Sequence, residues 1–104
     1  MKKQVKQIIG YKIQEDKEDE FSLIKEQMIK ESYTLEGLHS STTSKSLDEN
    51  NVFIDTMIWE SKDAAIHSCK NFENLPTSNK FLALMTGPPL FQYIMEYVED
   101  NIKN

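Results

Sequence analysis

The chain has 104 residues, which suits one domain with a single core, and a partner subunit is expected to add to the stability of so small a chain. Its 12 basic residues are all Lys, and 17 acidic residues give a formal net charge of −5. Without Arg or a basic excess, binding of nucleic acid and bidentate recognition of phosphate are poorly supported.

Residues 3–14 alternate between two faces, which predicts a first strand. One face carries Val5, Gln7, Ile9 and Tyr11, and Gly10 lies on the other. A glycine inside a strand marks a bulge or the close approach of another group, and a simple bend is the alternative.

The acidic run over residues 15–20 precedes an apolar stripe of Phe21, Ile24 and Met28. Acidic side chains favour the first turn of a helix. A helix is therefore expected from about Lys17 to about Ser32, with this stripe packed on the core.

The segment Leu38–Ser46 is rich in Ser and Thr and predicts a strand near the edge of a sheet. Turn-forming residues over 47–51 predict a hairpin into Val52–Trp59, which alternates with mostly apolar residues on both faces. A strand of that kind is expected at the centre of the sheet. Asp55 and Trp59 point the same way from it, and Asp55 is a carboxylate where an apolar residue would be expected.

Ser61 can cap a second helix that carries Ala65, Cys69 and Phe72 on one face. Cys69 is the only cysteine and has no adjacent His, so a small buried core residue is favoured over a reactive thiol. With no disulfide partner, no signal-peptide core in residues 1–13 and no apolar run of membrane-spanning length, a cytoplasmic protein outside the membrane is expected.

Thr77 or Ser78 can cap a short third helix, which residues 87–89, Gly-Pro-Pro, bring to an end. The last predicted strand is Leu90–Glu99. Its aromatic face, which includes Phe91, Tyr93 and Tyr97, is expected in an interior or an interface, and its mixed face is expected nearer water.

This order of elements is typical of an α+β, ferredoxin-like (split βαβ) fold, in which two main helices cover one face of a four-stranded antiparallel sheet. The other face of the sheet also carries apolar residues, and a soluble monomer rarely exposes such a patch. Packing two sheets face to face would bury it, so a homodimer is expected. The pattern does not settle which face carries Asp55.

No metal-ligand set, glycine-rich phosphate loop or nucleophile–base motif is present in the sequence. These absences argue against metal, nucleotide and hydrolase chemistry.

The strand ending in Trp59-Glu60-Ser61, the helix opening with Ala64-Ala65, and the Phe, Pro and short helix before a last strand resemble the antibiotic biosynthesis monooxygenase (ABM) family. The resemblance covers nearly the whole chain and is strongest over residues 52–85. It implies a single domain over residues 1–104 that pairs into a dimeric α/β barrel.

Two branches of that superfamily can be compared with this chain. Cofactor-free monooxygenases of polycyclic phenols imply an Asn four residues before the Trp, followed by a Tyr and an Arg. Trp59 matches, whereas Asp55, Ala65 and Asn79 stand at or near the other three positions. The haem-degrading branch implies a helical Trp, a His ten residues later and an Asn on the first strand. This chain has Ser68 and Ser78 there and no Asn within residues 3–14.

The resemblance suggests roles for a few side chains. If Asp55 faces a pocket, desolvation would disfavour its charged form and suit it to accept a proton from a phenolic or enolisable substrate. Trp59 would form a flat wall, and His67 or Tyr11 would donate or accept hydrogen bonds. The expected ligand-binding residues are Tyr11, Met57 and Phe72. The alternatives are a structural carboxylate, bonded to backbone or Lys groups, and a core aromatic residue.

Three functions follow from these residues. The first is a monooxygenase without a cofactor, or a related proton-transfer enzyme, acting on a small aromatic or quinol-like molecule. The second is a dimeric barrel that binds a small hydrophobic ligand without turning it over. The third is an assembly module whose pocket its own side chains fill.

Overall fold

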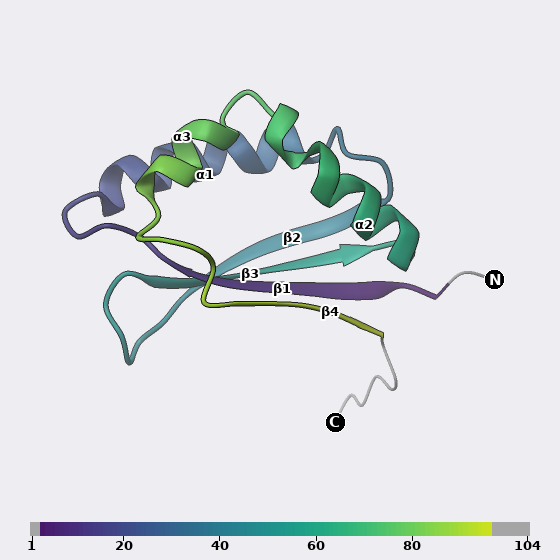
Figure 1. Ribbon diagram of the computed structural model, residues 1–104, viewed down its shortest axis with the longest axis horizontal. Helices are drawn as coiled ribbons and strands as arrows, with labels where there is room; N and C mark the ends of the chain where they lie inside the picture. The colour runs from purple at the N-terminus through teal and green to yellow at the C-terminus, as the bar shows by residue number, and fades with distance from the viewer. Residues whose placement is uncertain (1–2, 97–104) are drawn as a thin grey trace, which may run out of the picture.

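The computed structural model describes residues 3–96 as one antiparallel sheet with all helices on one of its faces (Figure 1). In chain order the elements are β1 (Val5–Lys12), α1 (Glu18–Ser32), β2 (Leu38–Lys45), β3 (Val52–Trp59), α2 (Lys62–Asn71), η1 (Phe72–Asn74), α3 (Ser78–Leu84) and β4 (Phe91–Glu96). The strands lie in the order β2-β3-β1-β4. The predicted ferredoxin-like fold is therefore confirmed, with β3 inside the sheet and the polar β2 at its edge.

Local sequence signals explain where the helices begin. The first turn of α1 carries three acidic residues, as expected. At α2 the Ser61 side chain accepts a hydrogen bond from the Ala64 amide at 3.1 Å, which confirms the predicted cap. Thr77 stands at the N-cap position of α3 but makes no cap bond. Its hydroxyl instead donates to Glu31 of α1 at 2.7 Å and ties the two helices together.

Strand register decides which side chains meet the helices. Ile9 of β1 lies opposite Asp55 of β3, and both belong to the alternating set that includes the buried Tyr11 and Trp59. Side chains of directly opposed residues point to the same face of a sheet. Asp55 therefore faces the helices, which settles the question that the sequence pattern leaves open.

The apolar core between sheet and helices has two parts. The larger is aromatic and lies under α1 and α3, with the buried residues Tyr11, Ile13, Phe21, Met28, Phe53, Phe81 and Leu84. The smaller lies under α2 and contains Val5, Trp59 and Ala65. The space between these two parts is where a cavity opens.

Gly10 marks a close approach rather than a bend. A Cβ atom at this position would lie 2.3 Å from the ring of Phe91 on the neighbouring strand β4. The aromatic ring thus covers the glycine on the face of the sheet away from the helices. Tyr93, two residues on, is 60% exposed on that same face. Tyr97 and the rest of the predicted strand end, to Glu99, lie outside the described residues.

One expectation about burial is wrong: Cys69 is exposed, although it lies on the predicted inner stripe of α2. Gln92 and Ile94 point to the helix side, because they lie opposite Ile9 and Gln7 of β1. Gln92 is nevertheless exposed, as expected for the mixed face of this strand. Within residues 3–96 no helix has the length and apolar character needed to cross a membrane.

Candidate active site

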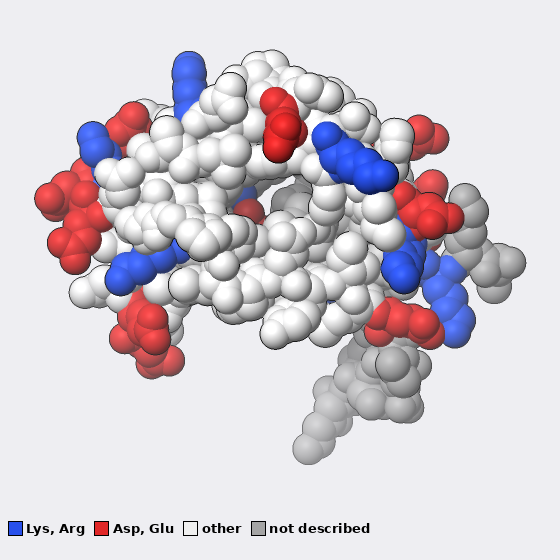
Figure 2. All heavy atoms as spheres, in the orientation of Figure 1, with Lys and Arg blue, Asp and Glu red and all other residues white. Residues whose placement is uncertain are grey.

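A cavity of about 250 Å³ lies between the sheet and the helix layer. In the space-filling view it is a hollow near the centre of the molecule, with charged atoms visible at its depth (Figure 2). Apolar side chains from β1, α1, β3, η1, α3 and the loop before β4 make up most of its lining. The volume and lining suit a small, mainly apolar molecule.

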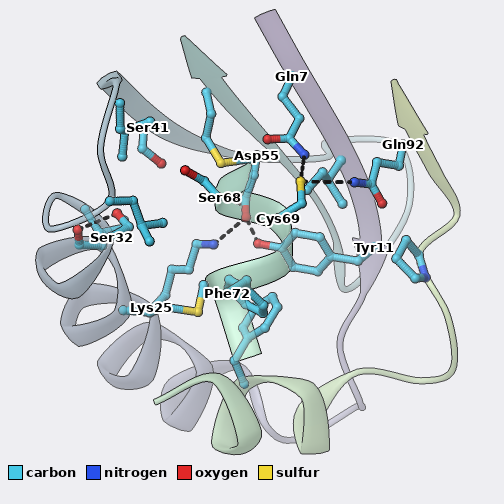
Figure 3. A pocket seen from close by; sticks show the side chains of 18 of the residues that line it. Gln7, Tyr11, Lys25, Ser32, Ser41, Asp55, Ser68, Cys69, Phe72 and Gln92 are labelled. Atoms are coloured by element: carbon cyan, nitrogen blue, oxygen red, sulfur yellow. Dashed lines mark hydrogen bonds and ion pairs between the residues drawn. The ribbon is translucent and has the colours of Figure 1, made fainter. Parts of the chain in front are cut away.

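Asp55 is the acidic residue in this cavity lining, and it is 6% exposed. Its Oδ1 atom accepts hydrogen bonds from the Tyr11 hydroxyl at 2.8 Å and the Thr43 hydroxyl at 2.9 Å. Its Oδ2 atom accepts one from the Lys25 ammonium, with which it forms a buried ion pair. Three donors from β1, β2 and α1 thus hold the carboxylate. Figure 3 shows the contacts of Tyr11 and Lys25 with Asp55.

Lys25 supplies the positive partner from the middle of α1. It is 6% exposed, and its Nζ atom lies 4.9 Å from the centroid of the Phe81 ring and 5.5 Å from that of Tyr11. Burial lowers the pKa of Lys25 below the ordinary lysine value, while the Asp55 carboxylate acts in the opposite direction. The ammonium therefore depends on Asp55 to remain charged.

Tyr11 is a permanently protonated donor. Burial raises the pKa of its hydroxyl well above the ordinary tyrosine value, and the Asp55 carboxylate raises it further. A phenolate beside a buried carboxylate would be a second negative charge at the same place. Tyr11 can therefore orient Asp55 but does not act as a base at neutral pH.

A second polar chain lies at another part of the cavity. The Trp59 Nε1–H donates to the Gln7 Oε1 atom at 2.9 Å, and the Gln7 amide donates to the Cys69 sulfur at 3.1 Å. Because an indole N–H can only donate, this contact fixes which end of the Gln7 amide faces Trp59 and which faces the cavity. Gln92 extends the chain with a long contact of 4.0 Å to the same sulfur (Figure 3).

The structure brings together most of the residues that the sequence singles out. Those that line the cavity are Tyr11, Asp55, Met57, Trp59 and Phe72. His67 does not line it and is exposed on α2, so the expected role of its ring at this site is wrong. His67 follows the buried Ala65 by two residues, which is a rotation of about 200° around the helix axis. Its side chain therefore points away from the sheet.

Sequence reasoning missed Lys25 and Gln7. Lys25 lies on the same helical stripe as Phe21 and Met28. Gln7 shares the inner face of β1 with Val5 and Ile9. A polar residue at a position that periodicity assigns to the core was the available signal for both. Such a residue needs a buried partner, and here the partners are Asp55 and Trp59.

No protein-family model and no curated protein matches this sequence. Solved structures match its fold closely. A proposed antibiotic biosynthesis monooxygenase from Caulobacter crescentus CB15 superposes with a TM-score of 0.79 at 19% identity, covering 94% of this chain and 92% of that one. A proposed member from Nitrosomonas europaea gives 0.78 at 14% identity, covering 94% and 93%.

SnoaB, a cofactor-independent oxygenase from Streptomyces nogalater, superposes with a TM-score of 0.72 at 15% identity, over 96% of both chains. At these identities the likeness shows the fold alone. The chain therefore has the ferredoxin-like fold of the antibiotic biosynthesis monooxygenases, in agreement with the resemblance of its sequence.

Proposed function

We propose that this protein binds a small aromatic molecule with an ionisable hydroxyl or enol group in its cavity and oxidises it with dioxygen, without a cofactor. The observation that carries the proposal is the buried pair of Asp55 and Lys25 in the lining of a mainly apolar cavity. A desolvated carboxylate and ammonium side by side can take a proton and hold the anion that results.

The two charged residues have separate tasks in this mechanism. Asp55 accepts the acidic proton of the substrate, and the Lys25 ammonium stabilises the phenolate or enolate oxygen. The electron-rich anion then reduces dioxygen. For a substrate with a reactive methylene group, one oxygen atom replaces its two hydrogens as a carbonyl, and the other leaves with those hydrogens as water. The substrate is thus the only reductant that the reaction needs.

The rest of the cavity suits such a substrate. Trp59 offers a flat aromatic wall, and Met57 and Phe72 add apolar surface beside it. The fold is similar to that of SnoaB, which is a cofactor-independent oxygenase. We therefore propose this reaction ahead of other proton-transfer reactions.

Replacing Asp55 with Asn is expected to abolish oxygen uptake while leaving ligand binding in place. Loss of a general base typically lowers a rate by about 10²–10⁴-fold. An oxygen electrode with anthrone or naphthohydroquinone measures turnover. Binding is followed by the fluorescence of Trp59, which is the only tryptophan of the chain and lines the cavity. Oxygen uptake by D55N at the wild-type rate would refute the role of Asp55 as base.

A second candidate is a binding protein that does not turn its ligand over. It is favoured by the three donors that already engage the Asp55 oxygens, since they suit a carboxylate with a structural task. The same two assays separate the candidates. Saturable quenching of Trp59 fluorescence by anthrone or naphthohydroquinone, without oxygen uptake with either compound, would favour the binding protein.

We also propose that a second copy of the chain covers the face of the sheet away from the helices. Residues on this face include the partly exposed Ile8, Ile54, Ile58 and Phe91 and the exposed Tyr93. Face-to-face packing of two such sheets would remove a contiguous apolar surface from water.

Replacing Ile54 with Lys is expected to weaken this dimer at least about tenfold, because a lysine at the centre of the interface would be buried without a partner. Sedimentation velocity over a range of concentrations measures the change. Asn79→Lys adds the same charge on α3, in the other layer of the fold, and serves as the control. A wild-type protein that sediments as a monomer at all concentrations would refute the assembly.

A further inference from the structure

Lys25 is an unusual lysine for reasons beyond its ion pair. It is the one buried lysine within residues 3–96, and Asp55 is the one hydrogen-bond acceptor that its ammonium has among those residues. An ammonium carries three N–H donors. The aromatic rings of Phe81 and Tyr11 stand near the nitrogen, where an exposed lysine would have water. Burial lowers the pKa of Lys25 and so favours the neutral amine, while the Asp55 carboxylate and the nearby ring faces favour the ammonium.

The amine can be reached by a ligand. Lys25 and Asp55 both line the cavity, which opens to solvent as the hollow in Figure 2. In the close view the Lys25 side chain extends from α1 into the cavity, with its nitrogen at the end that meets Asp55 (Figure 3). A small molecule in the cavity would therefore lie against the Lys25 side chain, with the Asp55 end of that side chain within the same lining.

Asp55 would keep its place if Lys25 changed its bonding. The hydroxyls of Tyr11 and Thr43 hold its Oδ1 atom from two different strands, independently of Lys25. Its Oδ2 atom faces the lysine nitrogen. A carboxylate held in this way can take a proton from the ammonium and return it, and it can pair with any cation formed at the nitrogen.

We propose that Lys25 forms an imine with a small aromatic aldehyde or ketone bound in the cavity, and that Asp55 is the counterion of the protonated imine. A lysine desolvated in an apolar pocket is a recognised form of activated amine nucleophile. This activity goes beyond the oxygenase proposal and does not depend on it.

The reaction needs no oxidant or reductant. The ammonium passes a proton to Asp55, and the nitrogen lone pair attacks the carbonyl carbon to form a carbinolamine. The carbon–oxygen bond then breaks, its hydroxyl takes up the proton from Asp55 and leaves as water, and a carbon–nitrogen double bond forms. The ammonium and the carbonyl compound together give one protonated imine and one water molecule.

The test is reductive trapping of the full chain at neutral pH under argon, with para-dimethylaminobenzaldehyde as the probe and cyanoborohydride as the reductant. We expect one adduct per chain, and peptide mapping by mass spectrometry is expected to place it on Lys25. Each unit by which the pKa of an amine falls raises its neutral fraction about tenfold at neutral pH. Burial lowers the pKa of Lys25, and the cavity that it lines would hold the probe beside it, so Lys25 should react before the exposed lysines. Exclusion of oxygen keeps this result separate from that of the oxygen electrode.

Matched variants and the visible spectrum complete the test. Lys25→Met should lose the adduct, whereas Lys30→Met should keep it, because Lys30 is exposed on the same helix beside Glu26. The protonated imine of the probe is coloured, and Asp55→Asn should reduce that colour at neutral pH by removing the counterion. If Lys25→Met does not fold, peptide mapping of the wild-type chain still shows whether the adduct lies on Lys25. Adducts spread evenly over the exposed lysines, with none favoured at Lys25, would overturn the proposal.

Discussion

Replacing Lys25 with Met is expected to destabilise the protein by about 3–5 kcal/mol, because the substitution leaves a buried carboxylate without its cation. The side chains of Lys25 and Asp55 are only 8% and 9% exposed, so water from the cavity would make up for only part of the lost ion pair. Urea denaturation followed by far-ultraviolet circular dichroism measures the free energy of unfolding. Met keeps the length and apolar stem of Lys, so little of the loss would come from packing.

Two further variants test this explanation. Lys30→Met removes an exposed lysine of the same helix, paired with Glu26 at 3.8 Å, and should change the free energy of unfolding by less than about 0.5 kcal/mol. Lys25→Met combined with Asp55→Leu removes both charges and should recover most of the loss. If the double variant is no more stable than Lys25→Met alone, the unpaired carboxylate is not the cause.

Recovery in the double variant would also bear on function. Buried ion pairs can often be replaced by well-packed apolar residues at no cost in stability. A pair that the fold does not need is better explained by the chemistry of the cavity that it lines. The double variant should then be a stable protein that binds apolar molecules but neither consumes oxygen nor forms an imine.

The secondary structure followed from local signals. The bounds of β3, Val52–Trp59, agree with the alternating pattern, and α1 begins one residue after the expected Lys17. Alternation, acidic first turns and a Ser cap act over a few residues, so a single sequence displays them. The central place of β3 also followed, because a strand that is apolar on both faces needs neighbours and layers around it.

The site was harder to predict from the sequence, because its contacts join distant parts of the chain. Lys25 and Asp55 are 30 residues apart, and Gln7 and Trp59 are 52 apart. Asp55 was identified as an unexpected carboxylate, but nothing local shows which cation or hydroxyl meets it. Cys69 illustrates the opposite error: periodicity places it toward the sheet, yet the helix there borders an open cavity and leaves the residue exposed.

Removing Trp59 is expected to have a comparable effect on stability. The residue is 2% exposed and packs in the smaller part of the core, so Trp59→Ala should cost about 3–5 kcal/mol. Circular dichroism must follow the unfolding, since the variant has no tryptophan to report it. Trp59→Phe keeps most of the ring surface and separates packing from hydrogen bonding.

Trp59→Phe is expected to lower the free energy of unfolding, because it removes the hydrogen bond from Trp59 to Gln7. Phe cannot donate to Gln7, whose amide oxygen would stay buried without a partner, and an orphaned buried acceptor costs about 1–3 kcal/mol. Trp59→Phe combined with Gln7→Leu removes both polar groups, so it should be more stable than the sum of the two single losses predicts. Additive losses would mean that water reaches the Gln7 oxygen from the cavity. In that case the polar chain of Trp59, Gln7 and Cys69 would belong to the solvated wall of the cavity and not to the core.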